Sequence, residues 1–216
     1  MTGDAGTGWL AGAGVVGVLR AATPEQALGA ARAAVRGGLR AIEVTMTVPD
    51  APEVLRTLRA ELGPTVHLGA GTVLTLAQAR QAQAAGATFL VSPHLGEDLL
   101  AWAREAQLAY LPGVLTPGEI ARALGLGAAA VKVFPVGALG GPAYLRDLAG
   151  PFPELAVLAT GRIAPDEVGA YLQAGARAVG LGSQLFPAPA LASGDWAAVE
   201  GAVRSALQTA RGAVPA

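Results

Sequence analysis

The sequence lacks cysteine altogether and carries only two histidines, His67 and His94, which lie far apart along its 216 residues. Without cysteine there is no disulfide, no thiolate nucleophile and no cysteine-ligated zinc site. The two histidines form no H-x-x-H-type pair, so we expect no metal site and no cofactor.

A basic block and a long apolar run are also missing. The net charge is −1 and no basic stretch is interleaved with aromatic residues, so we expect no nucleic-acid partner. No run of about 20 strongly apolar residues is available to cross a membrane. The N-terminal segment carries Asp4 and has no basic residue before Arg20, which argues against a signal peptide. We therefore expect a cytoplasmic protein with no membrane partner.

Asparagine is absent, and arginine replaces lysine at almost every position. A shortage of the thermolabile residues asparagine and cysteine is typical of heat-adapted proteins. A GC-rich genome would produce a similar bias towards alanine, arginine, glycine and proline. Both explanations, a thermophilic source and a GC-rich genome, are compatible with the composition.

Lys132 is the only lysine, and it lies in an apolar stretch, residues 129–135, that has the character of a strand. A buried ammonium group is costly unless it is paired or loses its proton. Lysine, unlike arginine, can lose that proton when it is desolvated, and the free amine is then a nucleophile. The alternative is an ordinary strand-end lysine that reaches water or pairs with a carboxylate.

Short apolar segments alternate with helix-like segments along the chain. We expect strands at residues 15–19, 39–45, 67–71, 88–92, 108–111, 129–135, 155–160 and 178–181, and helix starts at Thr23, Asp50, Thr75 and Thr116. Apolar strands separated by amphipathic helices indicate parallel β/α units. Eight such units predict an α/β protein, a (β/α)8 TIM barrel that forms a single domain over residues 1–216. A doubly wound open sheet is the alternative, although no G-x-G-x-x-G follows the first strand.

In such a barrel the active site lies at the C-terminal ends of the strands. The residues at these ends are Arg20, Glu43, Gly71, Thr72, Ser92, Pro93, Pro112, Gly113, Lys132, Thr160, Gly161, Gly182 and Ser183. Glu43, like Lys132, is a charged residue on an otherwise apolar strand. We interpret it either as the ion-pair partner of Lys132 or Arg20, or as a general acid/base whose pKa is raised by burial.

Lys132 beside a general base suggests a Schiff base with a ketone. The protonated imine is an electron sink, so a carbon–carbon bond one carbon away can break without a metal ion. The turns at Gly161 and at Gly182-Ser183 would direct backbone N–H groups and a helix N-terminus at a phosphate. They are equally compatible with ordinary glycine-rich turns.

With these residues in view, the chain resembles the 2-keto-3-deoxy-6-phosphogluconate (KDPG) aldolases. The matching segments follow one another along nearly the whole chain, at residues 37–45, 69–73, 91–94, 111–114, 131–135, 150–153 and 160–161. The resemblance implies a metal-independent class I aldolase that forms a homotrimer of TIM barrels. Its substrate would be a phosphorylated keto acid, cleaved to pyruvate and glyceraldehyde 3-phosphate.

The resemblance also implies a role for individual residues. Lys132 would form the Schiff base and Glu43 would shuttle protons. The residues around the pyruvate moiety would be Arg20, Thr72, Pro93 and Phe134, and those at the phosphate end would be Gly161, Arg162, Gly182 and Ser183.

The chain departs from the family in two places. Gly161 is followed by Arg162 where the family often has a second glycine, so the guanidinium either adds to the phosphate site or obstructs a backbone donor. Thr47 stands near the position where some members carry an arginine, so Arg20 is left to bind the substrate carboxylate. Both departures bear on substrate preference.

Other substrates and other activities fit the same residues. Cleavage of 4-hydroxy-2-oxoglutarate (KHG), which needs no phosphate site, and of the galactonate epimer of KDPG are close alternatives. An isomerase or epimerase on a phosphate-binding barrel would use Glu43 as base and Lys132 only for its charge. After the aldolases and the isomerases or epimerases, a non-catalytic sugar-phosphate sensor is the third class of function that these residues would fit. A single lysine favours the aldolase, because an imine mechanism requires lysine specifically.

Overall fold

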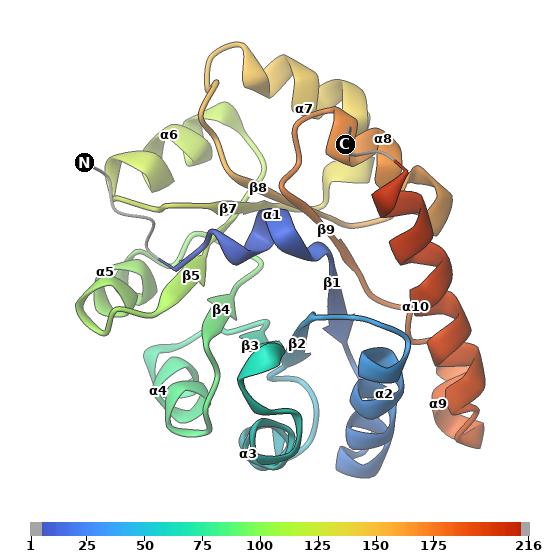
Figure 1. Cartoon of the computed structure of the whole chain (residues 1–216). Coiled ribbons are helices and arrows are strands. Elements are labelled where there is room, and N and C mark those ends of the chain that lie inside the picture. Colours follow the sequence, from blue (N-terminus) through green and yellow to red (C-terminus); the bar gives the residue numbers. More distant parts are fainter. Residues whose placement is uncertain (1–5, 213–216) are drawn as a thin grey trace.

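The computed structural model describes residues 6–212, and its strands form one parallel sheet (Figure 1). The strands are β1 (Gly14–Leu19), β2 (Ala41–Thr45), β3 (His67–Gly71), β4 (Phe89–Val91), β5 (Ala109–Leu111), β6 (Gly113–Val114), β7 (Val131–Val133), β8 (Val157–Thr160) and β9 (Ala178–Leu181). Their order in the sheet is β5-β4-β3-β2-β1-β9-β8-β7-β6.

The two ends of this list, β5 and β6, are consecutive pieces of one backbone stretch, separated only by Pro112. Proline has no N–H to donate to a ladder, so the strand is interrupted there. β5 pairs with β4 and β6 pairs with β7, and the Lys132 N–H donates to the Pro112 carbonyl at 2.9 Å. The stretch therefore closes the sheet, and the predicted eight-unit barrel is confirmed.

Helices surround the barrel (Figure 1). They are α1 (Trp9–Ala13), α2 (Pro24–Arg36), α3 (Ala51–Leu62), α4 (Leu76–Ala84), α5 (Glu97–Glu105), α6 (Pro117–Gly125), α7 (Pro142–Ala149), α8 (Val168–Gln173), α9 (Ala188–Ser193) and α10 (Trp196–Arg211), with 3-10 turns η1 (Gly63–Thr65), η2 (Val136–Leu139) and η3 (Pro165–Glu167). None of the helices within residues 6–212 is both long and apolar enough to cross a bilayer.

Local capping starts several of these helices. Thr23, Thr75 and Thr116 each accept a hydrogen bond from the backbone N–H three residues further on, as predicted. Asp50 is the N-cap residue of α3, so the predicted helix start is confirmed. Its side chain makes no capping hydrogen bond, and its backbone is left-handed at φ 50°.

The core has two layers. Alanines on α2 and apolar residues on the outer face of the sheet form the layer between barrel and helices. A smaller cluster that includes Leu10, Phe89 and Leu158 fills the barrel interior. α1, which the sequence pattern did not predict, lies across the N-terminal end of the barrel (Figure 1). The ring of Trp9 packs against those of His67 and Phe89, with centroid distances of 5.0 and 4.5 Å. α1 therefore covers the barrel interior at that end.

Candidate active site

Glu43 on β2 and Lys132 on β7 are both buried, with exposed fractions of 0% and 4%. Among the described residues, the other buried polar side chains apart from tyrosine are the hydroxyls of Thr45, Ser92 and Thr160, so Glu43 and Lys132 are the buried acid and the buried base. Charged groups are almost never fully buried unless they are paired or functional. The structure therefore supports the prediction that this pair is unusual.

The Glu43 carboxyl has no hydrogen-bond partner at either oxygen within residues 6–212. Burial raises the pKa of this carboxyl above its ordinary value of 4.5, while the positive charges of Lys132 and Arg20 oppose the rise. The ion pair considered as an alternative is not formed. A raised pKa and two free oxygens are the properties expected of a group that exchanges protons with a ligand.

Gly71, at the end of β3, makes room for this carboxyl. A Cβ atom at this position would lie 2.6 Å from Glu43 Oε1 and 2.8 Å from its Cδ. Non-bonded contacts of a Cβ atom are essentially never this short, so any side chain at position 71 would displace the Glu43 carboxyl.

Lys132 projects beside an aromatic ring. Its Nζ lies 5.0 Å from the centroid of Phe134, two residues further along the chain. An ammonium at that distance over a ring face gains a cation–π attraction. Phe134 therefore helps to place the amine at the C-terminal end of the strands, which is called the mouth of the barrel below.

Arg20 is held at the mouth by two hydroxyl groups. Its guanidinium donates to Thr47 Oγ1 at 3.1 Å and to Thr72 Oγ1 at 3.0 Å. Thr72 has φ 54°, which a β-branched residue adopts only under local strain. The structure thus joins Arg20 to Thr72, two of the residues expected around the pyruvate moiety, and it adds Thr47 as a partner of the arginine.

The turn after β8 carries the predicted phosphate residues Gly161 and Arg162. Gly161 has φ 105°, and a Cβ there would lie 2.9 Å from Pro135 Cα. The Gly137 N–H donates to the Gly161 carbonyl at 3.2 Å, which ties this turn to η2. Arg162 is exposed and left-handed, with φ 58°. A non-glycine residue in that conformation is strained, which is common at ligand-binding turns.

Pro93, Gly182 and Ser183 lie at the same end of the barrel, after β4 and β9. Pro93 is partly buried and Ser183 is exposed. No hydrogen bond within the described part of the chain joins either of them to Glu43 or Lys132. The topology brings these residues to the end of the barrel that also holds the buried pair.

Thr160, at the end of β8, is among the strand-end residues expected at the site, but the sequence assigned it no role. Its Oγ1 is buried and makes no hydrogen bond within residues 6–212, and Gly180 leaves space for it, since a Cβ there would lie 2.5 Å away. A buried hydroxyl without a partner beside a mouth is a candidate ligand contact. The signal in the sequence was its position at a strand end.

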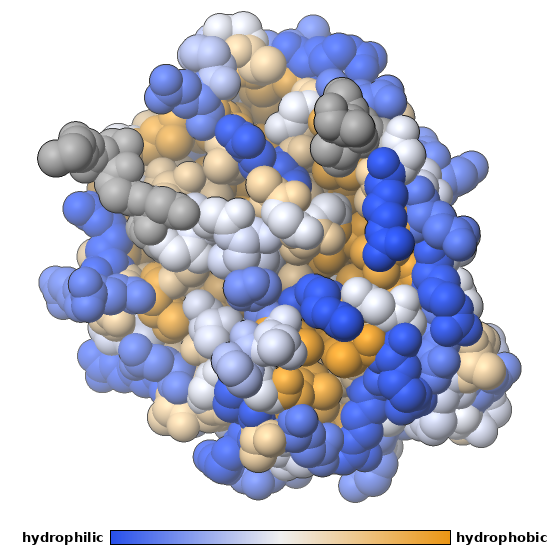
Figure 2. All heavy atoms as spheres, in the orientation of Figure 1, coloured by the Kyte–Doolittle hydropathy of each residue, from blue (hydrophilic) through white to orange (hydrophobic). Residues whose placement is uncertain are grey.

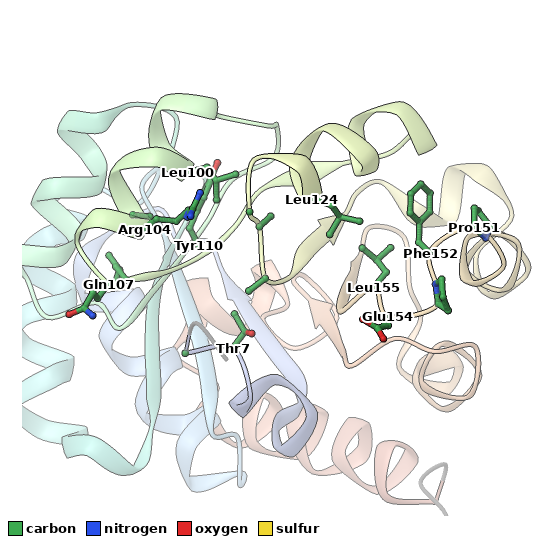
Figure 3. A pocket seen from close by; sticks show the side chains of 17 residues that line it. Thr7, Leu100, Arg104, Gln107, Tyr110, Leu124, Pro151, Phe152, Glu154 and Leu155 are labelled. Carbon is green, nitrogen blue, oxygen red and sulfur yellow. The ribbon is translucent and has the colours of Figure 1, made fainter. Parts of the chain in front are cut away.

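A cavity of about 1110 Å³ lies at the opposite, N-terminal end of the barrel. Figure 3 shows Arg104 and Gln107 on one side of it and Phe152, Glu154 and Leu155 on the other. It contains neither Glu43 nor Lys132, so we place the chemistry at the mouth despite the size of this groove. Within residues 6–212 no three His, Cys, Asp or Glu side chains gather as a metal site would need.

Comparisons with known proteins point to one family. Residues 8–202 match the family model "KDPG and KHG aldolase". The 2-dehydro-3-deoxy-phosphogluconate aldolase of Treponema pallidum is 38% identical over 90% of this chain and 92% of its own. The 2-dehydro-3-deoxy-6-phosphogalactonate aldolase of Escherichia coli is 31% identical over 81% of this chain and 85% of its own.

A solved structure matches the whole barrel. It is the KDPG aldolase of Legionella pneumophila, with pyruvate captured at low pH as a covalent carbinolamine intermediate. The two structures superimpose with a TM-score of 0.87 and share 31% sequence identity, over 95% of this chain and 99% of the other.

Proposed function

The chain belongs to the KDPG and KHG aldolase family, and from this premise we propose that it cleaves KDPG to pyruvate and glyceraldehyde 3-phosphate through a Schiff base on Lys132. The observation that carries the proposal is the buried pair: a single lysine, 4% exposed, near a carboxyl that has no hydrogen-bond partner in the described structure. The captured carbinolamine in the Legionella relative gives further support. A carbinolamine forms from an amine and a carbonyl, and Lys132 is the one lysine amine that this chain can offer.

The first step is addition of the neutral Lys132 amine to the C2 ketone of the substrate. The carbinolamine that results loses water and becomes a protonated imine, which withdraws electrons from the neighbouring carbon.

Glu43 then removes the proton of the C4 hydroxyl. The C3–C4 bond breaks, its electron pair passes through C3 into the imine to give an enamine, and C4 leaves as the aldehyde of glyceraldehyde 3-phosphate. The protonated Glu43 returns its proton to C3, and water hydrolyses the pyruvate imine to release the amine. One group serves as base and acid in turn, which suits a carboxyl whose pKa is raised by burial.

Arg20 binds the substrate carboxylate in this scheme, because a guanidinium forms strong charge-assisted hydrogen bonds with carboxylates. Thr72 and Thr47 hold it in place, and Pro93 and Phe134 pack around the pyruvate moiety. Gly161, Arg162, Gly182 and Ser183 form the phosphate end, where backbone N–H groups and the guanidinium face the anion.

The galactonate epimer is the second candidate substrate, because one relative carries that name. KHG is the third, because the family model names both activities. We also propose that the enzyme is metal-independent and assembles as a homotrimer, as the resemblance implies, and that it works in the cytoplasm.

A coupled assay tests the proposed function. Purified protein, treated with a chelator, is mixed with KDPG, its galactonate epimer or KHG, and pyruvate formation is followed with lactate dehydrogenase. We expect the highest kcat/KM for KDPG, with no loss after chelation. No pyruvate from any of the three substrates would contradict the proposal.

A further inference from the structure

A second cavity lies at the N-terminal end of the barrel, away from Glu43 and Lys132. Its volume is about 810 Å³, and small-molecule sites typically have roughly 300–1,000 Å³. It is bounded by α1, by the ends of α8 and α10, and by the residues that precede β2 and β9. Figure 2 views the face that carries α1, where hydrophilic side chains border an area of apolar and intermediate residues.

Three arginines line this cavity. Arg40 precedes β2, Arg177 precedes β9 and Arg211 ends α10, while no Asp or Glu among residues 6–212 contributes to the lining. Other exposed arginines, such as Arg32 and Arg122, form ion pairs with glutamates. No ion pair in the described part of the chain includes any of the three arginines of the cavity.

The remaining lining keeps the cavity open. It consists mainly of small residues and two leucines, namely Ala11, Gly12, Ala13, Gly14, Gly38, Leu172, Ala176, Leu207 and Ala210, with Gln173. A Cβ at Gly12 would meet no atom within 4 Å. Arg40 is also oriented in advance, because its Nη1 donates to the carbonyls of Leu39 at 3.0 Å and Val35 at 3.3 Å.

Helix ends oppose anion binding here, but the arginines outweigh them. α1, α2, α8 and α10 direct their C-termini towards this end of the barrel, and a helix C-terminus carries at most roughly −0.5 of an elementary charge. Four such ends amount to at most about −2, against three full positive charges from Arg40, Arg177 and Arg211. The electrostatic potential in the cavity is therefore positive. A guanidinium group can also donate two parallel hydrogen bonds to the oxygens of one phosphate.

We propose that this cavity is a second anion site, which binds a small molecule with two or more phosphate groups. Such a ligand matches the three separate arginines, while the alanines and leucines accept a small apolar body. The site is independent of the aldolase chemistry, because it lies at the other end of the barrel from the mouth.

Inorganic pyrophosphate is the probe for this proposal, and hydrogen exchange with mass spectrometry locates its binding. The test variant is Arg177→Gln with Arg211→Gln. The control is Arg80→Gln with Arg146→Gln, which removes the same charge from two exposed arginines outside the cavity. Peptides over residues 172–177 and 207–212 report on the cavity, and peptides over 160–162 and 182–183 report separately on the mouth.

At low salt we expect pyrophosphate to slow exchange in the cavity peptides of the wild type and of the control. In the test variant the concentration needed should rise by about tenfold or more, with circular dichroism unchanged. No protection of the cavity peptides in the wild type would overturn the proposal. Equal weakening in both variants would also overturn it, since net charge alone would then explain the binding.

Discussion

At the scale of single residues, the buried carboxyl of Glu43 lowers the stability of the folded protein. Both of its oxygens are buried without hydrogen bonds within the described residues. An unsatisfied buried polar group costs free energy of folding, and a carboxylate costs more than a neutral group. This loss of stability fits a catalytic role, because a carboxyl already hydrogen-bonded to the protein would exchange protons with a substrate less readily.

Glu43→Gln tests the proton shuttle. A group that transfers protons contributes about 10²–10⁴-fold to a rate, so turnover of KDPG should fall by about that factor. The variant should also stop exchanging the methyl protons of pyruvate for deuterium in heavy water, as followed by proton NMR. Exchange at the wild-type rate would assign the shuttle to another group.

Arg162→Gly tests the phosphate end. Glycine removes both the guanidinium and the strain of a left-handed arginine at φ 58°. We expect a higher KM for KDPG and little change with KHG, which has no phosphate, because charge-assisted bonds to phosphate are lost. Steady-state kinetics on both substrates provide the measurement. Equal effects on the two substrates, or none on either, would remove Arg162 from the phosphate end.

At the scale of elements, the regular units could be predicted and the irregular ones could not. The β/α alternation is visible in the sequence because buried parallel strands are continuous apolar runs between caps. α1 was missed because it has five residues, includes a glycine and has no side-chain cap. Long-range contacts hold it, with Trp9 stacked on His67 and Leu10 buried in the barrel.

The same contrast applies to the site. Lys132 and Glu43 were predictable because a charge on an apolar strand stands out in the sequence. The free oxygens of Glu43 and the left-handed backbones of Thr72 and Arg162 were not, because they depend on neighbours from other strands and turns. Thr72 and Arg162 are not glycines, so their residue types give no sign of a positive φ.

Thr116→Ala tests whether local capping stabilises α6. The Thr116 hydroxyl accepts from the Glu119 N–H, and the Glu119 carboxylate accepts from the Thr116 N–H at 2.7 Å. Losing an N-cap costs about 1 kcal/mol, so chemical denaturation should show a loss of that size. The control is Thr65→Ala, an exposed threonine outside the caps. Equal losses in both variants would contradict the capping role.

At the scale of the whole molecule, stability rests on the closed barrel and its alanine-rich helix layer. Ion pairs such as Arg32–Glu61, at 2.6 Å, and Arg122–Glu97, at 2.8 Å, join neighbouring helices, but their side chains are about half exposed. Exposed pairs contribute little to stability. These pairs therefore do not distinguish heat adaptation from a GC-rich genome.

Glu43 should also shape the pH dependence of global stability. Burial raises its folded-state pKa above the ordinary value of 4.5. Between 4.5 and the raised pKa, the folded protein holds a proton that the unfolded chain has lost, so stability falls as pH rises through this window.

Glu43→Gln removes that titration. The variant should be more stable than the wild type at pH 8, and its advantage should shrink as the pH is lowered towards 4.5. Denaturant unfolding at several pH values measures this, with the exposed Glu105→Gln as control. An advantage that does not vary with pH would show that the pKa of Glu43 is the same in the folded and the unfolded protein, and would contradict the raised pKa.

The central claim is that the buried lysine forms a Schiff base, and borohydride trapping tests it most directly. Protein incubated with pyruvate and sodium borohydride should gain the mass of one reduced pyruvyl group, located by peptide mass spectrometry on Lys132. Lys132→Arg should gain no such group and lose nearly all turnover, since arginine does not release its proton to attack a ketone. Adduct formation elsewhere, or substantial KDPG cleavage by Lys132→Arg, would contradict the account.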